Sequence, residues 1–105
     1  MKMQKIAIVG AGLVGTALAY LLKEKSYTLV GLADLREESL QKAATLIGGK
    51  LRTTTAPEEV TAEGDLVFIT TSDSAIQEAC ERIAQKSGFH PGQIVVHTSG
   101  ACHCT

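Results

Sequence analysis

The sequence predicts an α/β fold in three layers, with a parallel sheet of about five strands between two layers of helices. Short apolar runs rich in β-branched residues alternate along the 105 residues with longer segments of helical spacing. The spacers are short, and strands that alternate with helices in this way pair in parallel through right-handed crossovers. We expect about five strands in the order 3-2-1-4-5.

The first strand and the first helix come from one uncharged stretch, residues 6–22. Residues 5–10 are continuously apolar after Lys5 and end in glycine, as in a strand buried on both faces. Three glycines interrupt the stretch and its period changes from strand to helix, so a signal peptide or a membrane span is not expected. The helix should bury one apolar face, formed by Val14, Leu18, Leu21 and Leu22.

The remaining elements continue the alternation. Further strands are expected at residues 27–34, 50–54, 65–71 and 92–98. Helices are expected at 36–49, for one turn from Pro57, and at 72–88, with a capping box between Ser74 and Gln77 in the last of them. The buried face of the second helix should hold Leu40, Ala43, Ala44 and Ile47. The buried face of the last helix should hold Ile76, Ala79, Cys80 and Ile83. Cys80 is expected to be an inert core residue.

The turn after the first strand carries a glycine motif, G-x-G-x-x-G, at residues 10–15. It follows a strand and opens a helix, which is the setting in which this motif binds the pyrophosphate of a dinucleotide at the helix N-terminus. Gly10 would permit the tight turn, Gly12 the approach of the pyrophosphate, and Gly15 the close packing of helix on strand. The candidate cofactor-binding residues here are Gly10, Ala11, Gly12, Leu13, Val14 and Gly15.

An acidic residue, Asp34, ends the second strand 19 residues after Gly15. A carboxylate at this place accepts hydrogen bonds from the adenosine ribose and repels a 2′-phosphate, which favours NAD over NADP. Arg36 keeps NADP as an alternative, because a nearby guanidinium is how a 2′-phosphate is usually accommodated.

The nicotinamide half of such a site lies beyond the fourth and fifth strands, since ligands bind outside the carboxyl ends of the strands. The loops there contain Thr71 and Ser72, and then Ser99. We expect Thr70, Thr71 and Ser72 to meet the nicotinamide side of the cofactor. Ser99 and Gly100 should lie where a substrate approaches the nicotinamide. Asp73 is expected to cap or flank the following helix.

Three segments together carry a resemblance to a known family: the strand–GAGLVG–helix unit, DLVFITTSDSAI (65–76) and PGQIVVHTSGA (91–101). They resemble the N-terminal half of a family of Rossmann-like oxidoreductases that carry a helical C-terminal domain of uncharacterised function. Wider relatives are the 6-phosphogluconate dehydrogenase, hydroxyisobutyrate dehydrogenase and pyrroline-5-carboxylate reductase type of enzyme. The similarity spans about residues 5–101, and Ser72 departs from it where such proteins commonly have proline.

The resemblance implies that residues 1–105 are the dinucleotide-binding Rossmann domain of an NAD(P)-dependent oxidoreductase, without its C-terminal substrate domain. This chain alone is then expected to be inactive, and no residue is assigned as catalytic. A small polar substrate would be bound only together with the missing domain. The apolar surface that such a domain would cover could let the chain form a homodimer.

Composition excludes several other classes. A net charge of −1 and four aromatic residues, none of them Trp, argue against nucleic acid or an anionic membrane as a partner. Three cysteines without a spaced framework favour a cytoplasmic location. Cys102, His103 and Cys104 are consecutive and lack a second ligand pair, so no metal site is expected.

One alternative from another class stays open. The chain also resembles the non-catalytic NAD(H)-sensing regulatory domains of potassium-transport systems, which share the glycine turn and an acidic end to the second strand. The HTSGA segment, residues 97–101, argues against a sensor, which needs no polar loop aimed at the nicotinamide. A reading frame that continues past Thr105 into a helical domain would favour the oxidoreductase.

Overall fold

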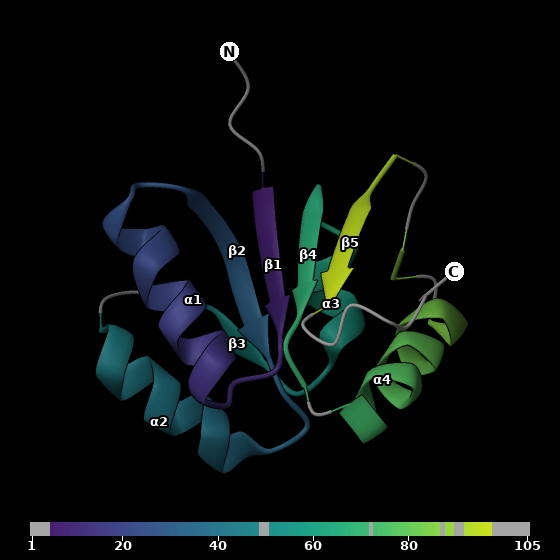
Figure 1. Ribbon diagram of the computed structural model, residues 1–105, viewed down its shortest axis with the longest axis horizontal. Helices are drawn as coiled ribbons and strands as arrows, with labels where there is room; N and C mark the ends of the chain where they lie inside the picture. The colour runs from purple at the N-terminus through teal and green to yellow at the C-terminus, as the bar shows by residue number, and fades with distance from the viewer. Residues whose placement is uncertain (1–4, 49–50, 72, 87, 90–91, 98–105) are drawn as a thin grey trace.

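The computed structural model describes residues 5–48, 51–71, 73–86, 88–89 and 92–97 of the chain. They form a five-stranded parallel sheet with two helices on each face (Figure 1). The strand order is β3-β2-β1-β4-β5, so the predicted fold class and order are confirmed. The strands are β1 (Lys5–Val9), β2 (Thr28–Ala33), β3 (Thr53–Thr54), β4 (Leu66–Ile69) and β5 (Ile94–His97). The helices are α1 (Leu13–Glu24), α2 (Glu37–Ile47), α3 (Pro57–Thr61) and α4 (Asp73–Gln85).

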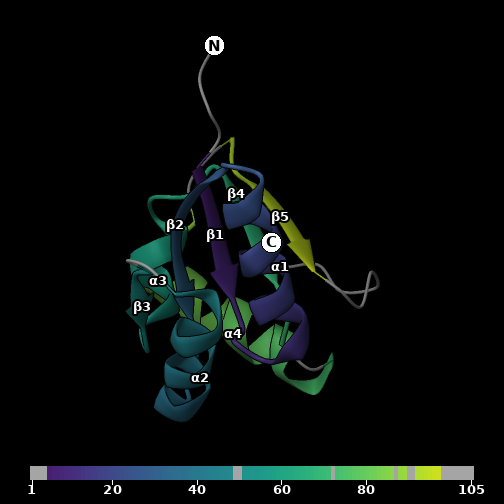
Figure 2. The same ribbon diagram turned by 90° about the vertical axis from the view of Figure 1, so that its left-hand side faces the viewer.

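The core consists of two hydrophobic clusters, one on each face of the sheet. Successive residues of β1 alternate between them: Ile6 and Ile8 belong to the cluster with α1 and α2, and Ala7 and Val9 to the cluster with α3 and α4. β1 therefore lies at the centre of the sheet with both faces covered, as the continuous apolar run predicts. In the view turned by 90°, α1 and α2 lie in front of the strands and α4 behind them (Figure 2).

The buried face of α1 differs in part from the predicted one. Leu18 and Leu22 pack against the core as predicted, and Gly15 and Ala19 are buried, whereas Val14 and Leu21 are each 56% exposed. The reason is the close approach at Gly15, where a Cβ would overlap the carbonyl oxygen of Gly10. This contact turns the Gly15 side of the helix toward the sheet and leaves Val14 and Leu21 on its flank.

Other boundaries also differ. β3 is only two residues long, and α4 begins at Asp73. The side chain of Ser74 lies outside the described part of the chain, so its capping box with Gln77 stays a prediction. On the buried faces of α2 and α4, Leu40, Ala43, Ile47 and Ile83 are buried as predicted.

Candidate functional site at the carboxyl ends of the strands

The glycine loop after β1 is held close to the end of β4. Gly10 has a φ of +113°, in the left-handed region that favours glycine, and a Cβ there would lie 2.8 Å from the Oγ1 of Thr70. Gly15 lies against the loop from the helix side, so closely that a Cβ at this position would overlap the carbonyl oxygen of Gly10. The close packing expected at Gly15 is thus present, and the two glycines shape the turn.

Gly12 has a different environment from the other two glycines of the motif. It is the N-cap residue of α1, with φ −75° and ψ −162°, a conformation open to any residue. A Cβ at Gly12 would meet no atom within 4 Å. Space for a ligand therefore lies directly beside the first N–H groups of α1, which attract an anion.

Asp34 follows β2 and lies half-buried beside the glycine loop. Its Oδ2 accepts a hydrogen bond from the N–H of Ala11 at 2.7 Å, and its Oδ1 accepts one from the N–H of Arg36 at 2.8 Å. The N–H of Asp34 itself donates to the carbonyl oxygen of Thr54 in β3 at 3.1 Å. The carboxylate is therefore held in one place between two loops.

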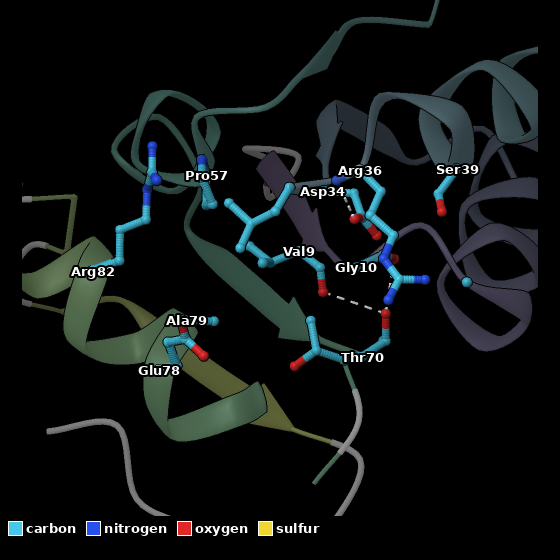
Figure 3. A pocket seen from close by; sticks show the side chains of 13 residues that line it. Val9, Gly10, Asp34, Arg36, Ser39, Pro57, Thr70, Glu78, Ala79 and Arg82 are labelled. Carbon is cyan, nitrogen blue, oxygen red and sulfur yellow. Dashed lines mark hydrogen bonds between the residues drawn. The ribbon is translucent and has the colours of Figure 1, made fainter. Parts of the chain in front are cut away.

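A cavity of about 530 Å³ opens at this edge of the sheet (Figure 3). Its size is within the usual range for pockets that bind small molecules and cofactors. Figure 3 shows Asp34, Arg36 and Ser39 on one side and Glu78, Ala79 and Arg82 on the other, with Val9 and Thr70 between them. The cavity thus runs across the carboxyl ends of the strands, from the helix layer of α2 to that of α4.

Five of the predicted site residues line this cavity together: Gly10, Gly12, Asp34, Arg36 and Thr71. Ala11 and Gly15 are buried behind it, while Leu13, 92% exposed, and Val14 lie on the outer surface at the start of α1. Ser72 and Ser99 lie outside the described residues. The Oγ1 of Thr71 is buried and has no hydrogen-bond partner within the described structure, so it is available to a ligand in the cavity.

Sequence reasoning missed the part of the cavity that comes from α3 and α4. Pro57, Glu78, Ala79 and Arg82 line it from there. The Nε of Arg82 lies 3.4 Å from a carboxylate oxygen of Glu58, which holds this wall to α3. No local motif signals such a wall, because its residues are brought together only when both helices pack on the sheet.

Other predictions about side chains have mixed outcomes. Cys80 is buried as predicted for a core residue, but it is disulfide-bonded and therefore not a thiol. Within the described ranges, no three His, Cys, Asp or Glu side chains lie together as metal ligands would. Cys102, His103 and Cys104 lie outside those ranges. None of the helices in the described part of the chain is long and apolar enough to cross a membrane.

A parallel sheet in the order 3-2-1-4-5 with a glycine turn and a cavity at its carboxyl edge defines a doubly wound α/β domain. Comparison with protein families identifies the family within this class. Residues 2–105 match the Rossmann-like domain, and the chain belongs to this family. No protein of curated function matches the chain.

Solved structures share the fold. A presumed NADP oxidoreductase from Bacteroides fragilis is 28% identical, with a TM-score of 0.73 over 94% of this chain and 37% of that protein. A semialdehyde dehydrogenase NAD-binding protein from Cupriavidus necator, solved with NAD and calcium, is 26% identical. Its TM-score is 0.71, over 92% of this chain and 33% of that protein. The Synechocystis arogenate dehydrogenase, 21% identical, matches in fold with a TM-score of 0.75, over 90% of this chain and 32% of that protein. The chain spans about a third of the length of these proteins.

Proposed function

We propose that this chain is the cofactor-binding domain of an NAD(P)-dependent oxidoreductase and that it prefers NAD. The observation that carries the proposal is the open space beside Gly12, in a cavity that the Asp34 carboxylate also lines. A dinucleotide needs an anion site and a ribose site a few ångströms apart, and these two residues supply them at one edge of the sheet.

The described residues fit such a cofactor. Its pyrophosphate would lie over Gly12, against the N–H groups and the positive end of α1. The adenosine ribose would hydrogen-bond to Asp34, whose oxygens retain lone pairs beyond those used by the backbone. The nicotinamide, when bound, exchanges a hydride with a substrate, while the protein orients it and excludes water. Thr71, Ser72 and Ser99 are proposed to contact the nicotinamide side.

The preference for NAD follows from the charge at the ribose site. A 2′-phosphate would lie against the Asp34 carboxylate and be repelled. Arg36 also lines the cavity and could attract that phosphate. However, the carboxylate is fixed beside the ribose site by two backbone hydrogen bonds, and Arg36 is an exposed side chain. We therefore expect the carboxylate to decide the selectivity.

The proposed domain would need a second, helical domain to bind a small polar substrate. No residue of this chain is proposed as catalytic, and the chain by itself is expected to be inactive. The cytoplasm is the proposed location. A homodimer is a further proposal, based on the exposed apolar residues Ile94 and Val96 of β5.

The test is a titration of the purified, reduced chain with NADH and NADPH in parallel, followed by nicotinamide fluorescence. Saturable binding of NADH that is tighter than that of NADPH is the expected result. Tighter binding of NADPH would contradict the assignment of Asp34. An absence of binding to both would contradict the proposal that this chain holds a dinucleotide.

A further inference from the structure

The backbone of the glycine loop is fixed at Gly10 by protein groups. The N–H of Gly10 donates to the carbonyl oxygen of Ala33 in β2 at 2.6 Å. The carbonyl oxygen of Gly10 accepts a hydrogen bond from the Oγ1 of Thr70 at 2.9 Å. Both polar backbone groups of Gly10 are therefore satisfied before any ligand binds.

The next residue, Ala11, is held in the same way. Its N–H donates to the Oδ2 of Asp34 at 2.7 Å, and its carbonyl oxygen accepts a hydrogen bond from the Oγ1 of Thr16 at 3.1 Å. Ala11 is buried, with an exposed fraction of 5%. Its N–H is thus not free for a pyrophosphate, which must use the N–H groups from Gly12 onward.

Asp34 is the only acidic side chain among these four partners of the loop, which are otherwise two hydroxyls and a backbone carbonyl. A hydrogen bond to a carboxylate is stronger than one between neutral groups. The second oxygen of Asp34 holds the N–H of Arg36 at the start of α2. One carboxylate therefore ties the glycine loop to the loop that follows β2.

We propose that Asp34 is a positioning residue for the glycine loop, in addition to the ribose contact of the proposed function on which this inference rests. Through the Ala11 N–H it keeps the loop in its binding shape in the unliganded protein. The anion site and the ribose site are then coupled through one side chain. Loss of the Asp34 carboxylate weakens binding at the anion site even for a ligand that has no ribose.

The first test measures hydrogen exchange at the Ala11 amide in the unliganded chain by NMR. In Asp34→Ala this amide should exchange about tenfold faster or more, because its acceptor is gone. The Ile8 amide in β1 serves as the internal reference and should keep its rate, which distinguishes local release from general unfolding. An unchanged rate at Ala11 would overturn the proposal.

Asp65→Ala is the matched control. Asp65 also accepts a hydrogen bond from a backbone N–H, that of Lys5 at 3.2 Å, but it lies at the amino end of β4, at the opposite edge of the sheet. Asp65→Ala removes the same carboxylate and the same charge as Asp34→Ala, without touching the glycine loop. The Ala11 exchange rate should be the same in Asp65→Ala as in the parent chain, and an equal acceleration in both variants would overturn the proposal.

Asp34→Asn keeps the test decisive if Asp34→Ala does not fold. An amide has one acceptor oxygen where the carboxylate has two. At least one of the two N–H groups, that of Ala11 or that of Arg36, must then exchange faster. Unchanged protection of both would overturn the proposal.

The second test titrates inorganic pyrophosphate into the same variants and follows the amide shifts of residues 12–16. Removing a negative charge near the site should by itself strengthen binding of an anion. Positioning by Asp34 predicts the opposite, a loss of about tenfold in Asp34→Ala with no change in Asp65→Ala. Equal or tighter binding in Asp34→Ala would show that Asp34 acts on the ribose alone.

The two tests separate this inference from the proposed function. If the parent chain binds neither NADH, NADPH nor pyrophosphate, the proposed function is contradicted. The exchange of the Ala11 amide still decides whether Asp34 holds the loop, because that measurement needs no ligand.

Discussion

The three motif glycines have different roles at the scale of single residues. Gly10 needs its positive φ, and Gly15 lies so close to Gly10 that no side chain fits between them. Gly12 has neither constraint, because its backbone conformation is open to any residue and the space around it is free. The structure therefore offers no packing reason for glycine at position 12, which agrees with the ligand approach proposed for this position.

This difference gives a prediction for Gly12→Val. The added side chain would occupy the space proposed for the pyrophosphate, so NADH binding should be lost. The free energy of unfolding should fall by only about 1 kcal/mol or less, the size of an N-cap effect. NADH titration and urea unfolding measure the two quantities, and retained affinity would contradict the site.

Gly15→Ala is the comparison variant. Its Cβ would overlap the carbonyl oxygen of Gly10, so the variant should lose roughly 1–3 kcal/mol of stability, as overpacked sites do. A Gly15→Ala chain as stable as Gly12→Val would contradict the packing described here.

Asp34→Ser tests cofactor selectivity at the same scale. Removal of the carboxylate abolishes its repulsion of a 2′-phosphate, and Arg36 remains nearby. The ratio of NADPH to NADH affinity should therefore rise by about tenfold or more, since close like charges cost several kcal/mol. The ratio is the informative quantity, because the absolute affinities also include the loss of the Ala11 hydrogen bond. An unchanged ratio in parallel titrations would refute the selectivity role.

At the scale of elements, the helices are held by small buried faces with charged outer surfaces. α4 contributes Cys80 and Ile83 to the cluster that also contains Val60 of α3 and Val67 of β4. The same helix presents Glu78, Ala79 and Arg82 to the cavity. The packing of Ile83 therefore places one wall of the site.

Ile83→Ala should destabilise the chain by about 2–5 kcal/mol, because the Ile83 side chain is fully buried and its removal leaves a cavity. Leu46→Ala on α2 is the control: Leu46 is 71% exposed, and its truncation should change stability by less than about 0.5 kcal/mol. Urea unfolding compares the two variants. Similar losses would show that the α4 packing described here is wrong.

At the scale of the whole molecule, the cavity lies between two layers that are far apart in the sequence. Asp34 and Arg82 line the same cavity although 48 residues separate them. A ligand that contacts both walls binds the folded chain and not the unfolded one, so it must raise the stability of the whole domain.

NADH should therefore raise the melting temperature of the chain. At a concentration 100 times its Kd, a ligand adds about 2.7 kcal/mol to the free energy of unfolding. For a domain of this size that corresponds to roughly 10 °C or more. Differential scanning fluorimetry measures the shift, which should be absent in Gly12→Val; an equal shift in that variant would place NADH elsewhere.

The sequence by itself determined the alternation of strands and helices, the parallel strand order and the glycine turn. These features depend on local signals: buried β-branched runs, helical spacing and glycines between a strand and a helix. It also identified Asp34, because an acid at the end of the second strand has a fixed spacing from the glycine motif.

The tertiary structure alone decided which residues share the cavity and how the helices are turned. The α3–α4 wall has no sequence motif, and the flank position of Val14 and Leu21 depends on the contact between Gly15 and Gly10. The hydrogen bond from Ala11 to Asp34 joins residues 23 apart. The physical reason is the same in each case: periodicity records which residues are buried, whereas contacts between elements depend on packing distances that no local pattern encodes.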